Sequence, residues 1–296
     1  MSTLNRDGRK TVFITGCTSP GIGNALAREF QAKGCRVIAS ARTRKAIADL
    51  EELGIETVDL DVCDEESVKA AAREVEGLVG ERGLDVLVNN AGRNMTLPAL
   101  DVPLSEARAT FETNFFAVVL MNQQFTPLLI RASPSLILNI GSVAGIIPYI
   151  YSSIYNASKA ALHAYSDTLR LELEPFGVRV MVVVTGGVQS NIARTERLLP
   201  DDSLYRPVER EFNARVKHSQ SNAMDTGMYA RGLVREALKT EPKQWVWRGN
   251  MAHAIKWAWN LGLGGWLFGR YMRRIGGLWR LAAMVGSKKV EGKKIV

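Results

Sequence analysis

The sequence is poor in the residues that build disulfide frameworks and metal clusters. Its three cysteines, Cys17, Cys35 and Cys63, are spread through 296 residues without the spacing of a metal site. Such a sparse, odd-numbered set is typical of free thiols in a reducing compartment. The first ten residues, MSTLNRDGRK, contain no apolar stretch, so we expect no secretory signal. These features favour a cytoplasmic protein that binds no metal.

Acidic residues are almost missing towards the end of the chain. Residues 243–296 hold eleven Lys and Arg residues, one acid (Glu291) and all six tryptophans. The longest uncharged stretch there, Trp257–Gly269, has thirteen residues, whereas a spanning helix needs about 20. We favour an interfacial segment, because Trp, Lys and Arg suit the surface of an anionic membrane. The alternative is a helix that covers a substrate pocket or an oligomer interface. Nucleic acid is not expected, because the cations alternate with long apolar residues.

Residues 1–242 alternate short β-branched runs with helix-like stretches, which predicts one domain followed by a helical tail. We expect strands at 11–15, 35–40, 55–60, 84–90, 135–142 and 178–184, with an edge strand at 244–249. We expect helices at 21–34, 43–53, 65–80, 105–130 and 154–175. This order is typical of a doubly wound parallel α/β sheet, a Rossmann fold of three αβα layers, whose ligands lie beyond the carboxyl ends of the strands. The polar residues 191–225 are expected to form an irregular loop over the substrate.

A glycine-rich loop, TGCTSPGIG, follows the first expected strand. Its glycines are Gly16, Gly21 and Gly23. Glycines at such a place let the backbone approach a diphosphate that rests on the helix N-terminus. The second strand ends in Ser40 and Ala41, where an NAD-binding protein would carry an acid, and Arg42 follows. An arginine can bind a 2′-phosphate, so we expect NADPH/NADP+ as the cofactor. The alternative is that Arg42 only begins a solvated helix.

Tyr155 precedes Lys159 by four residues, so the two side chains would be neighbours on one face of a helix. A lysine charge about 4 Å from a phenol is worth about 4 kcal/mol at an effective dielectric constant of about 20. We therefore expect the pKa of Tyr155 to fall from about 10 towards 7, as a general acid requires. The alternative is a surface pair. Tyr149 and Tyr151 are expected to be pocket-wall residues, and His163 a structural histidine.

The chain resembles the short-chain dehydrogenase/reductase family from about residue 11 to residue 190. The resemblance is carried by the glycine loop, NNAG at residues 89–92, Asn114, Ser142, and Tyr155 with Lys159. Ser142 lies thirteen residues before Tyr155, the usual spacing in this family. The resemblance implies that Tyr155 is the general acid/base, that Ser142 orients the carbonyl, that Lys159 holds the nicotinamide ribose, and that Asn114 supports a proton relay.

The same resemblance implies a set of cofactor-binding residues. They are Gly16, Thr18, Gly21, Ile22, Gly23, Arg42, Asp61, Val62, Asn89, Gly92, Tyr155, Lys159, Val188 and Ser190. Two departures from the family pattern affect this set. Four residues rather than three separate Gly16 from Gly21, and Thr185 stands where the family carries a proline. We nevertheless expect cofactor binding to be retained.

The motifs predict an NADPH-dependent reductase that transfers a hydride to the carbonyl of a hydrophobic substrate. The chain looks most like the members of the family that reduce 1-acyl-dihydroxyacetone phosphate. The alternatives are a ketoreductase or alcohol dehydrogenase of polyketide or terpenoid specialised metabolism, and a non-catalytic NADPH-binding scaffold. The resemblance also implies a homodimer or homotetramer, joined through the helices at 105–130 and 154–175. A lipid substrate would suit a peripheral position on the endoplasmic reticulum or a lipid droplet.

Overall fold

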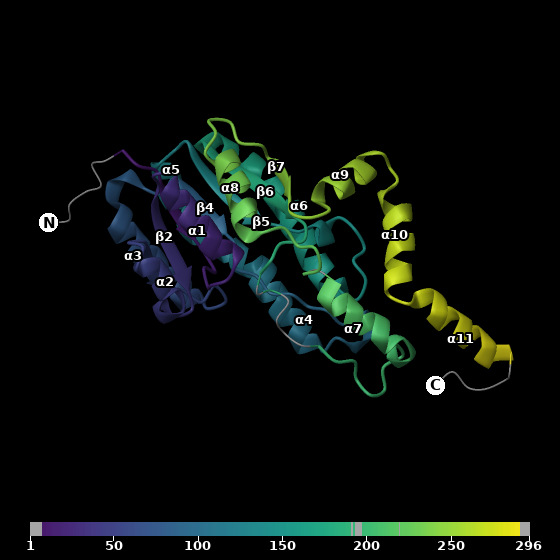
Figure 1. The fold of residues 1–296 in the computed structure, drawn as a ribbon. Coiled ribbons are helices and arrows are strands. Elements are labelled where there is room, and N and C mark those ends of the chain that lie inside the picture. Colours follow the sequence, from purple (N-terminus) through teal and green to yellow (C-terminus); the bar gives the residue numbers. More distant parts are fainter. Residues whose placement is uncertain (1–7, 191, 193–196, 219, 291–296) are drawn as a thin grey trace.

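The computed structural model describes residues 8–190, 192, 197–218 and 220–290, the last three by their backbone alone. A seven-stranded sheet in the order β3-β2-β1-β4-β5-β6-β7 runs through its centre (Figure 1), and every pair of neighbouring strands is parallel. The strands are β1 (Thr11–Ile14), β2 (Arg36–Ala41), β3 (Glu56–Asp59), β4 (Val86–Asn89), β5 (Ser135–Ile140), β6 (Val178–Thr185) and β7 (Trp245–Arg248). All seven expected strands are present. The strand order reverses between β1 and β4, where such sheets bind ligands.

Helices cover both faces of this sheet, as the sequence predicted. On one face lie α1 (Ile22–Ala32) and α8 (Thr226–Ala237), which share a core with alternate strand residues such as Val12 and Ile14. On the other face lie α3 (Glu65–Val79), α5 (Ala117–Arg131) and α6 (Ser153–Leu173), packed on a core that includes Phe13. Successive side chains of a strand point to opposite faces, so Phe13 faces away from both of its neighbours. The Rossmann architecture is therefore confirmed.

Two expected helices are broken into shorter pieces. In place of one helix at 43–53 there is a 3-10 turn (Arg44–Ile47) followed by the short α2 (Ala48–Glu51). The expected helix at 105–130 consists of α4 (Leu104–Phe111), a π-helical turn (Glu112–Phe116) and α5. Asn114 lies inside that π-helical turn, a type of distortion that is frequent at functional sites.

The expectation of an irregular loop over residues 191–225 is wrong for its second half. A 3-10 turn (Arg206–Val208) leads into α7 (Glu209–His218). Val208, Phe212 and Arg215 are buried and recur at helical spacing, so one face of this segment packs on the protein. The polar composition of the segment concealed this short apolar stripe.

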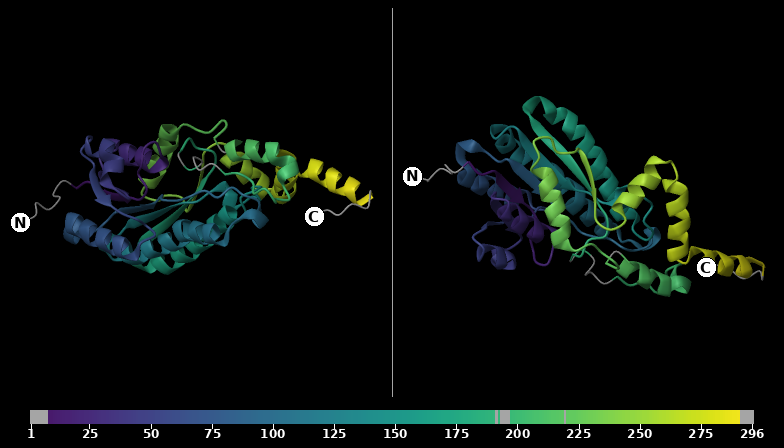
Figure 2. Two further views of the ribbon diagram at one scale, coloured as in Figure 1. Left: turned by 90° about the horizontal axis from the view of Figure 1, so that it is seen from below. Right: turned by 45° about the horizontal axis from the view of Figure 1, so that its top comes forward.

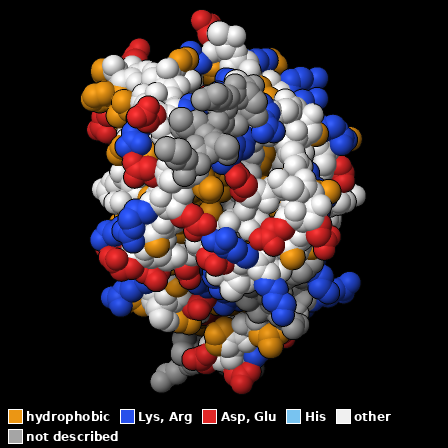
Figure 3. Space-filling model, turned by 90° about the vertical axis from the view of Figure 1, so that its left-hand side faces the viewer, with side chains coloured by type: hydrophobic (Ala, Val, Ile, Leu, Met, Phe, Trp, Pro, Cys, Tyr) orange, Lys and Arg blue, Asp and Glu red, His pale blue; other side chains and the backbone are white. Residues whose placement is uncertain are grey.

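In the described part of the chain, three helices follow the last strand: α9 (Ala252–Asn260), α10 (Gly264–Ile275) and α11 (Leu278–Val290). They lie beyond the end of the sheet that carries α4 and α7, and α11 points away from the body (Figures 1 and 2). Since β7 belongs to the sheet, the tail proper begins after residue 250. The opposite end of the molecule, seen in Figure 3, mixes acidic and basic side chains and lacks the cationic bias of the tail.

The packing of α5 on the sheet gives a stability prediction. Phe13 of β1 and Phe125 of α5 are fully buried, and their rings stack at 4.9 Å between centroids. Because truncation removes apolar burial and leaves a cavity, Phe125→Ala should lower the free energy of unfolding by about 3–5 kcal/mol. Chemical denaturation would measure this. Phe176→Ala, at a half-exposed position, should change it by less than about 0.5 kcal/mol, and equal effects of the two variants would contradict the packing.

Candidate active site

The glycine loop is held against the segment that follows β4. The Thr15 hydroxyl accepts hydrogen bonds from the backbone N–H groups of Asn90 and Ala91, each at 3.0 Å, and Asn90 Nδ2 donates to the Thr15 and Gly16 carbonyls at 2.8 and 3.0 Å. A Cβ at Gly16 would lie 2.9 Å from the Ala91 Cα, and one at Gly23 would lie 2.5 Å from both Asn90 Nδ2 and the Gly16 carbonyl oxygen. Only glycine permits these approaches.

The N-terminus of α1 is open to an anion. Its N-cap, Gly21, supplies no side-chain hydrogen bond, and the first turn contains no acidic residue. The first N–H groups of a helix lack intrahelical partners and carry a partial positive charge, which suits a diphosphate. The extra loop residue is accommodated in a tight turn, since a Cβ at Gly21 would lie 2.7 Å from the Thr18 carbonyl oxygen. The predicted contacts of Thr18 and Ile22 would be made here.

The two arginines that follow β2 have different surroundings. Arg44 forms ion pairs with Asp59 and Glu74 at 3.4 and 2.7 Å. Arg42 is exposed and forms no ion pair with the residues that the structure describes. Ser40 is fully buried, and its hydroxyl donates to the Ile14 carbonyl. Arg42 is therefore the guanidinium at this strand end that is free to meet a phosphate.

Several predicted cofactor residues have side chains committed to the protein itself. Asn89 is buried, and its Nδ2 donates to the Oδ1 atoms of Asn122 and Asn139 at 3.0 and 2.8 Å. Val62 and Val188 are buried in the two cores of the sheet. The backbone N–H of Ser190 donates to Gln220 Oε1 at 3.1 Å. If Asn89, Val62 or Val188 contacts a cofactor, we expect it to do so through its main-chain atoms.

Asp61 and Gly92 follow the carboxyl ends of β3 and β4. The Asp61 carboxylate accepts the backbone N–H of Cys63 at 3.0 Å, which turns the chain after β3. A Cβ at Gly92 would lie 3.3 Å from Asn114 Oδ1 and 3.8 Å from Lys159 Nζ. Gly92 thus places the segment after β4 directly beside two predicted catalytic residues.

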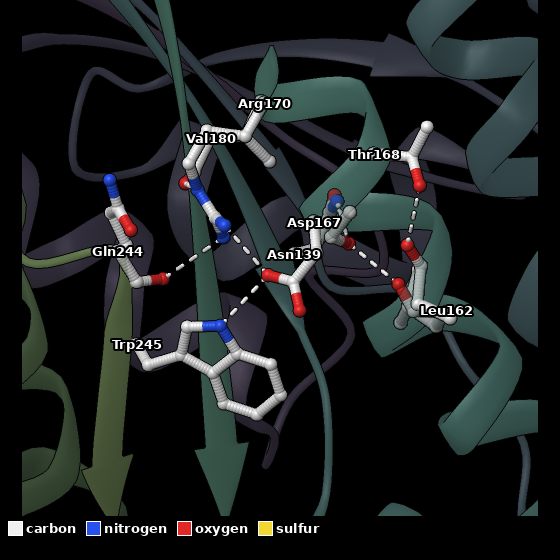
Figure 4. A network of polar contacts seen from close by, with 10 residues as sticks. Asn139, Leu162, Asp167, Thr168, Arg170, Val180, Gln244 and Trp245 are labelled. Carbon is white, nitrogen blue, oxygen red and sulfur yellow. Dashed lines mark hydrogen bonds and ion pairs between the residues drawn. The ribbon is translucent and has the colours of Figure 1, made fainter.

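The far half of α6 is anchored to the sheet by polar contacts (Figure 4). Arg170 donates to the Val180 carbonyl at 2.8 Å and pairs with Asp167 at 2.6 Å. The indole N–H of Trp245, on β7, donates to the same Asp167 carboxylate at 2.8 Å (Figure 4). These bonds fix the axis of the helix whose first turns carry Tyr155 and Lys159.

Lys159 is almost completely buried. Its Nζ donates to the Ile140 carbonyl at 2.8 Å, and no described acid pairs with it. Burial disfavours the charged ammonium and lowers the pKa of Lys159 from 10.5 to about 8. Asn114 contacts the residue that precedes Lys159: its Nδ2 donates to Ser158 Oγ at 3.0 Å, and its Oδ1 accepts the Arg93 N–H at 2.9 Å.

The expected fall in the pKa of Tyr155 is wrong for this structure. Burial raises the pKa of the phenol, and a side-chain hydrogen bond with Ser142 opposes this rise. Lys159 does not lower it, since the ammonium is directed at the Ile140 carbonyl and is itself weakened by burial. Tyr155 is therefore a protonated phenol at neutral pH, with Ser142 beside it.

His163, expected to be structural, contacts the catalytic segment directly. Its Nε2 accepts the Ser142 backbone N–H at 3.2 Å, while its buried Nδ1 has no partner among the described residues. Burial lowers the pKa of His163 from 6.5 to about 4, so the ring is neutral at pH 7. The Ser142 hydroxyl accepts the Ala144 N–H at 3.1 Å. His163 thus positions the serine.

Thr185, which replaces the family proline, has a partner of its own. Its hydroxyl lies 2.7 Å from the hydroxyl of Tyr229, a fully buried residue of α8. Gly186, which follows it, donates its N–H to the Arg248 carbonyl at 2.7 Å, extending the ladder between β6 and β7. The sequence analysis did not single out Tyr229, Asn122 or Asn139, whereas Asn90 lies in the NNAG motif. Asn139, a polar residue within the apolar run SLILNI, was the available signal among the first three.

An apolar cluster packs against Tyr155. Its buried members are Met95, Leu97, Tyr151, Leu199 and Phe212, and partly buried Ile150, Ile154 and Tyr155 pack against them. Tyr151 and Tyr149, expected to be wall residues, contact the tail and α7: the Tyr151 hydroxyl donates to the Gly276 carbonyl at 2.5 Å, and the Tyr149 hydroxyl lies 2.8 Å from His218 Nδ1. The tail and α7 therefore help to enclose this side of the site.

Comparison with known proteins identifies the family to which this arrangement belongs. Residues 10–199 match the family model for short chain dehydrogenases. The chain is 40% identical over 249 residues to the short-chain dehydrogenase srdE of Neurospora crassa, a match that covers 83% of this chain and 85% of the relative. The protein is therefore a member of the short-chain dehydrogenase/reductase family, and the sequence prediction of an enzyme of this class is confirmed.

Other relatives bear more specific names. The chain is 41% identical over 210 residues to the NADPH-dependent 1-acyldihydroxyacetone phosphate reductase of Schizosaccharomyces pombe, covering 69% of this chain and 70% of the relative. Among solved structures, a short-chain dehydrogenase from Streptomyces avermitilis superposes with a TM-score of 0.74 at 24% identity, over 97% of this chain and 98% of that one. A short-chain dehydrogenase from Burkholderia cenocepacia, solved in complex with NADP, superposes with a TM-score of 0.66 at 23% identity, over 84% of this chain and 92% of that one.

The neutral, buried His163 predicts a pH dependence of stability. The unfolded imidazole takes up a proton near pH 6.5 and the folded one near pH 4, so the unfolded state binds more protons between these values. The free energy of unfolding should fall by about 3 kcal/mol from this group as the pH is lowered from 6.5 to 4. Urea denaturation across this range would show a smaller fall for His163→Gln. Identical slopes in the two proteins would contradict the assignment.

Proposed function

We propose that the protein is an NADPH-dependent reductase that transfers a hydride to the carbonyl carbon of a hydrophobic substrate. The observation that carries this proposal is the grouping of Ser142, Tyr155, Lys159 and Asn114 beside the open N-terminus of α1 and the apolar cluster around Tyr155. Arg42, which is exposed and has no ion-pair partner among the described residues, supports a 2′-phosphate and hence NADPH. The names of the fission-yeast reductase and of the NADP-bound bacterial structure agree with this choice of cofactor.

The residues divide the work of carbonyl reduction. Bound NADPH supplies the hydride, and the protein supplies the proton and the stabilisation of the oxygen. Tyr155 donates its phenolic proton to the carbonyl oxygen, and its raised pKa keeps that proton in place at neutral pH. Ser142, beside the phenol, donates a hydrogen bond to the same oxygen as negative charge develops and keeps its own proton. Asn114 supports the turn that carries Tyr155 through Ser158, whose hydroxyl accepts from Asn114 and donates to the Tyr155 carbonyl at 2.8 Å. Lys159, the next residue, would hold the nicotinamide ribose.

Two substrate classes fit the apolar cluster. A 1-acyl-dihydroxyacetone phosphate would place its acyl chain there, as the name of the fission-yeast relative suggests. A polyketide or terpenoid ketone, or the reverse oxidation of the alcohol, would use the same apolar wall. The complete catalytic set argues against the third candidate, a non-catalytic NADPH-binding scaffold. Assembly as a homodimer or homotetramer through α4, α5 and α6 is supported by the exposed Leu104, Phe116 and Leu171 on these helices and the turn between them.

We also propose that the tail holds this cytoplasmic enzyme at the surface of the endoplasmic reticulum or of a lipid droplet. Trp257, Trp266 and Trp279 expose 68%, 67% and 58% of their surface. The exposed guanidinium groups of the tail helices are Arg270, Arg273, Arg274 and Arg280, of which Arg280 alone forms a described ion pair, with Glu211. In the described part of the chain, no helix is both long and apolar enough to cross a bilayer. This composition suits the plane of the membrane interface.

The opposite face of the tail supports the alternative role of a pocket cover. Ile255 and Met272 are buried against Ile147, together with Ile146 and Ile150. Ile146, Ile147 and Ile150 lie between Ser142 and Tyr155 in the sequence. One tail can therefore serve both roles, with its inner face on the active-site wall and its outer face towards lipid.

The catalytic assignment predicts the behaviour of Tyr155→Phe. This variant should reduce NADPH consumption with 1-acyl-dihydroxyacetone phosphate, or with a long-chain ketone, by about 10²- to 10⁴-fold, because the general acid is lost. NADPH binding, followed by the change in cofactor fluorescence, should be retained. A variant that reduces the substrate at the wild-type rate would overturn the proposed function, as would a wild-type protein that binds NADPH but reduces neither carbonyl.

The membrane proposal predicts binding to anionic vesicles. The wild-type protein should co-sediment with vesicles of phosphatidylcholine and phosphatidylserine, and Trp257→Ala/Trp266→Ala should weaken this binding by about tenfold or more, because interfacial aromatic burial is lost. Raising the salt concentration should also weaken it. Leu100→Ala removes a similarly exposed apolar side chain outside both the tail and the proposed oligomer interface, and serves as the control. Equal loss in both variants, or no binding by the wild type, would refute a specific role of the tail.

A further inference from the structure

Two arginines share one carboxylate at the edge of the catalytic centre. Arg93 directly follows Gly92, and Arg197 comes from the segment between β6 and α7. Their Nη2 atoms lie 2.6 and 3.0 Å from the same oxygen, Oε2 of Glu106 on α4. Two guanidinium groups against one carboxylate leave a net charge of +1, so the cluster has capacity for a further anion.

This cluster is attached to the catalytic residues. The main chain of Arg93 is held by Asn114 in both directions: its N–H donates to Asn114 Oδ1 at 2.9 Å, and its carbonyl accepts from Asn114 Nδ2 at 3.0 Å. Arg93 and Arg197 also stand two residues before Met95 and Leu199, which are buried members of the apolar cluster around Tyr155. A substrate with its chain in that cluster would therefore end near the two arginines.

Arg197 is not an ordinary surface cation. Its side chain is only 17% exposed, and its buried Nε has no hydrogen-bond partner among the residues that the structure describes. A buried donor without a partner is unfavourable, so a ligand oxygen that accepted this N–H would remove a cost already present in the protein. Guanidinium groups bind phosphate and carboxylate oxygens through paired N–H donors.

We propose that Arg93 and Arg197 form a subsite for an oxyanion, a phosphate or carboxylate carried by the substrate at the end of its apolar chain. Glu106 holds the two guanidinium groups together and competes with that anion. The inference rests on the proposed function, since it assumes that the reducible substrate occupies the apolar cluster. It favours an anionic lipid-like ketone over a neutral polyketide or terpenoid ketone.

Equilibrium binding to the NADP+ complex tests the subsite without requiring turnover. The probes are decyl phosphate, decanoate and decanol, which share one apolar chain and differ in the head group; calorimetry would measure their Kd values. The wild type should bind an anionic probe about 10- to 100-fold more tightly than decanol, the range of a charge-assisted hydrogen-bonding group. The comparison of phosphate with carboxylate identifies which oxyanion the subsite takes.

Three variants separate recognition of the anion from a structural tie between the loop and α4. Arg197→Met should remove most of the preference for the anion while changing the Kd of decanol by less than about twofold. Glu106→Gln should tighten anion binding, because the competing charge is lost. Arg108→Met, on the same helix at an exposed arginine with no described partner, should change nothing.

Two results would overturn the proposal. The first is a wild-type protein that binds the three probes equally. The second is an Arg197→Met variant that weakens binding of decanol as much as that of the anions, which would mark Arg197 as structural. Failure of the proposed function is recognised separately, as the absence of Tyr155-dependent NADPH consumption.

Discussion

The close contact between the glycine loop after β1 and the segment after β4 is the constraint on which the site depends. Four hydrogen bonds made by Thr15, Gly16 and the residues that follow β4 join the two segments. The absence of side chains at Gly16 and Gly23 allows the close approach. This contact lies where the strand order reverses, so it fixes the open N-terminus of α1. It also fixes Gly92 against Lys159. The contact between these two backbone segments therefore positions both the cofactor site and the catalytic site.

Burial controls the charge state of the catalytic groups. The pKa values of Lys159 and His163 are lowered and that of Tyr155 is raised, in each case chiefly by loss of water. No described acid compensates Lys159, which donates instead to a backbone carbonyl. Ionisable groups held in this way cost stability and are typical of active sites, where a proton must be available at neutral pH. The protonated state of Tyr155 suits a reductase, because reduction of a carbonyl consumes that proton.

The wall of the site is built from segments far apart in the sequence. Arg215 of α7 is buried, donates to the Ile150 carbonyl and to Ser152 Oγ at 3.0 and 2.8 Å, and lies 3.7 Å above the ring of Tyr149. The turn between α10 and α11 accepts the hydroxyl of Tyr151. Both contacts restrain the stretch between Ser142 and Tyr155. Movement of α7 or of the tail would thus displace the stretch that joins Ser142 to Tyr155. The positions of the catalytic residues therefore depend on the positions of α7 and the tail.

The sequence by itself determined the strands and the order of the catalytic residues, because β-branched alternation and motif spacing are local properties of the chain. It also located the basic, tryptophan-rich tail. Only the tertiary structure decided what depends on burial and on distant partners. The polar segment 191–225 contains α7 because Phe212 and Arg215 find a surface to pack on. Asn114 lies in a π-helical turn. The pKa of Tyr155 rises because the phenol is buried, and Arg93 meets Arg197 through Glu106. Such contacts join residues that lie far apart in the sequence, so they cannot be predicted from the local periodicity or from the spacing of motifs.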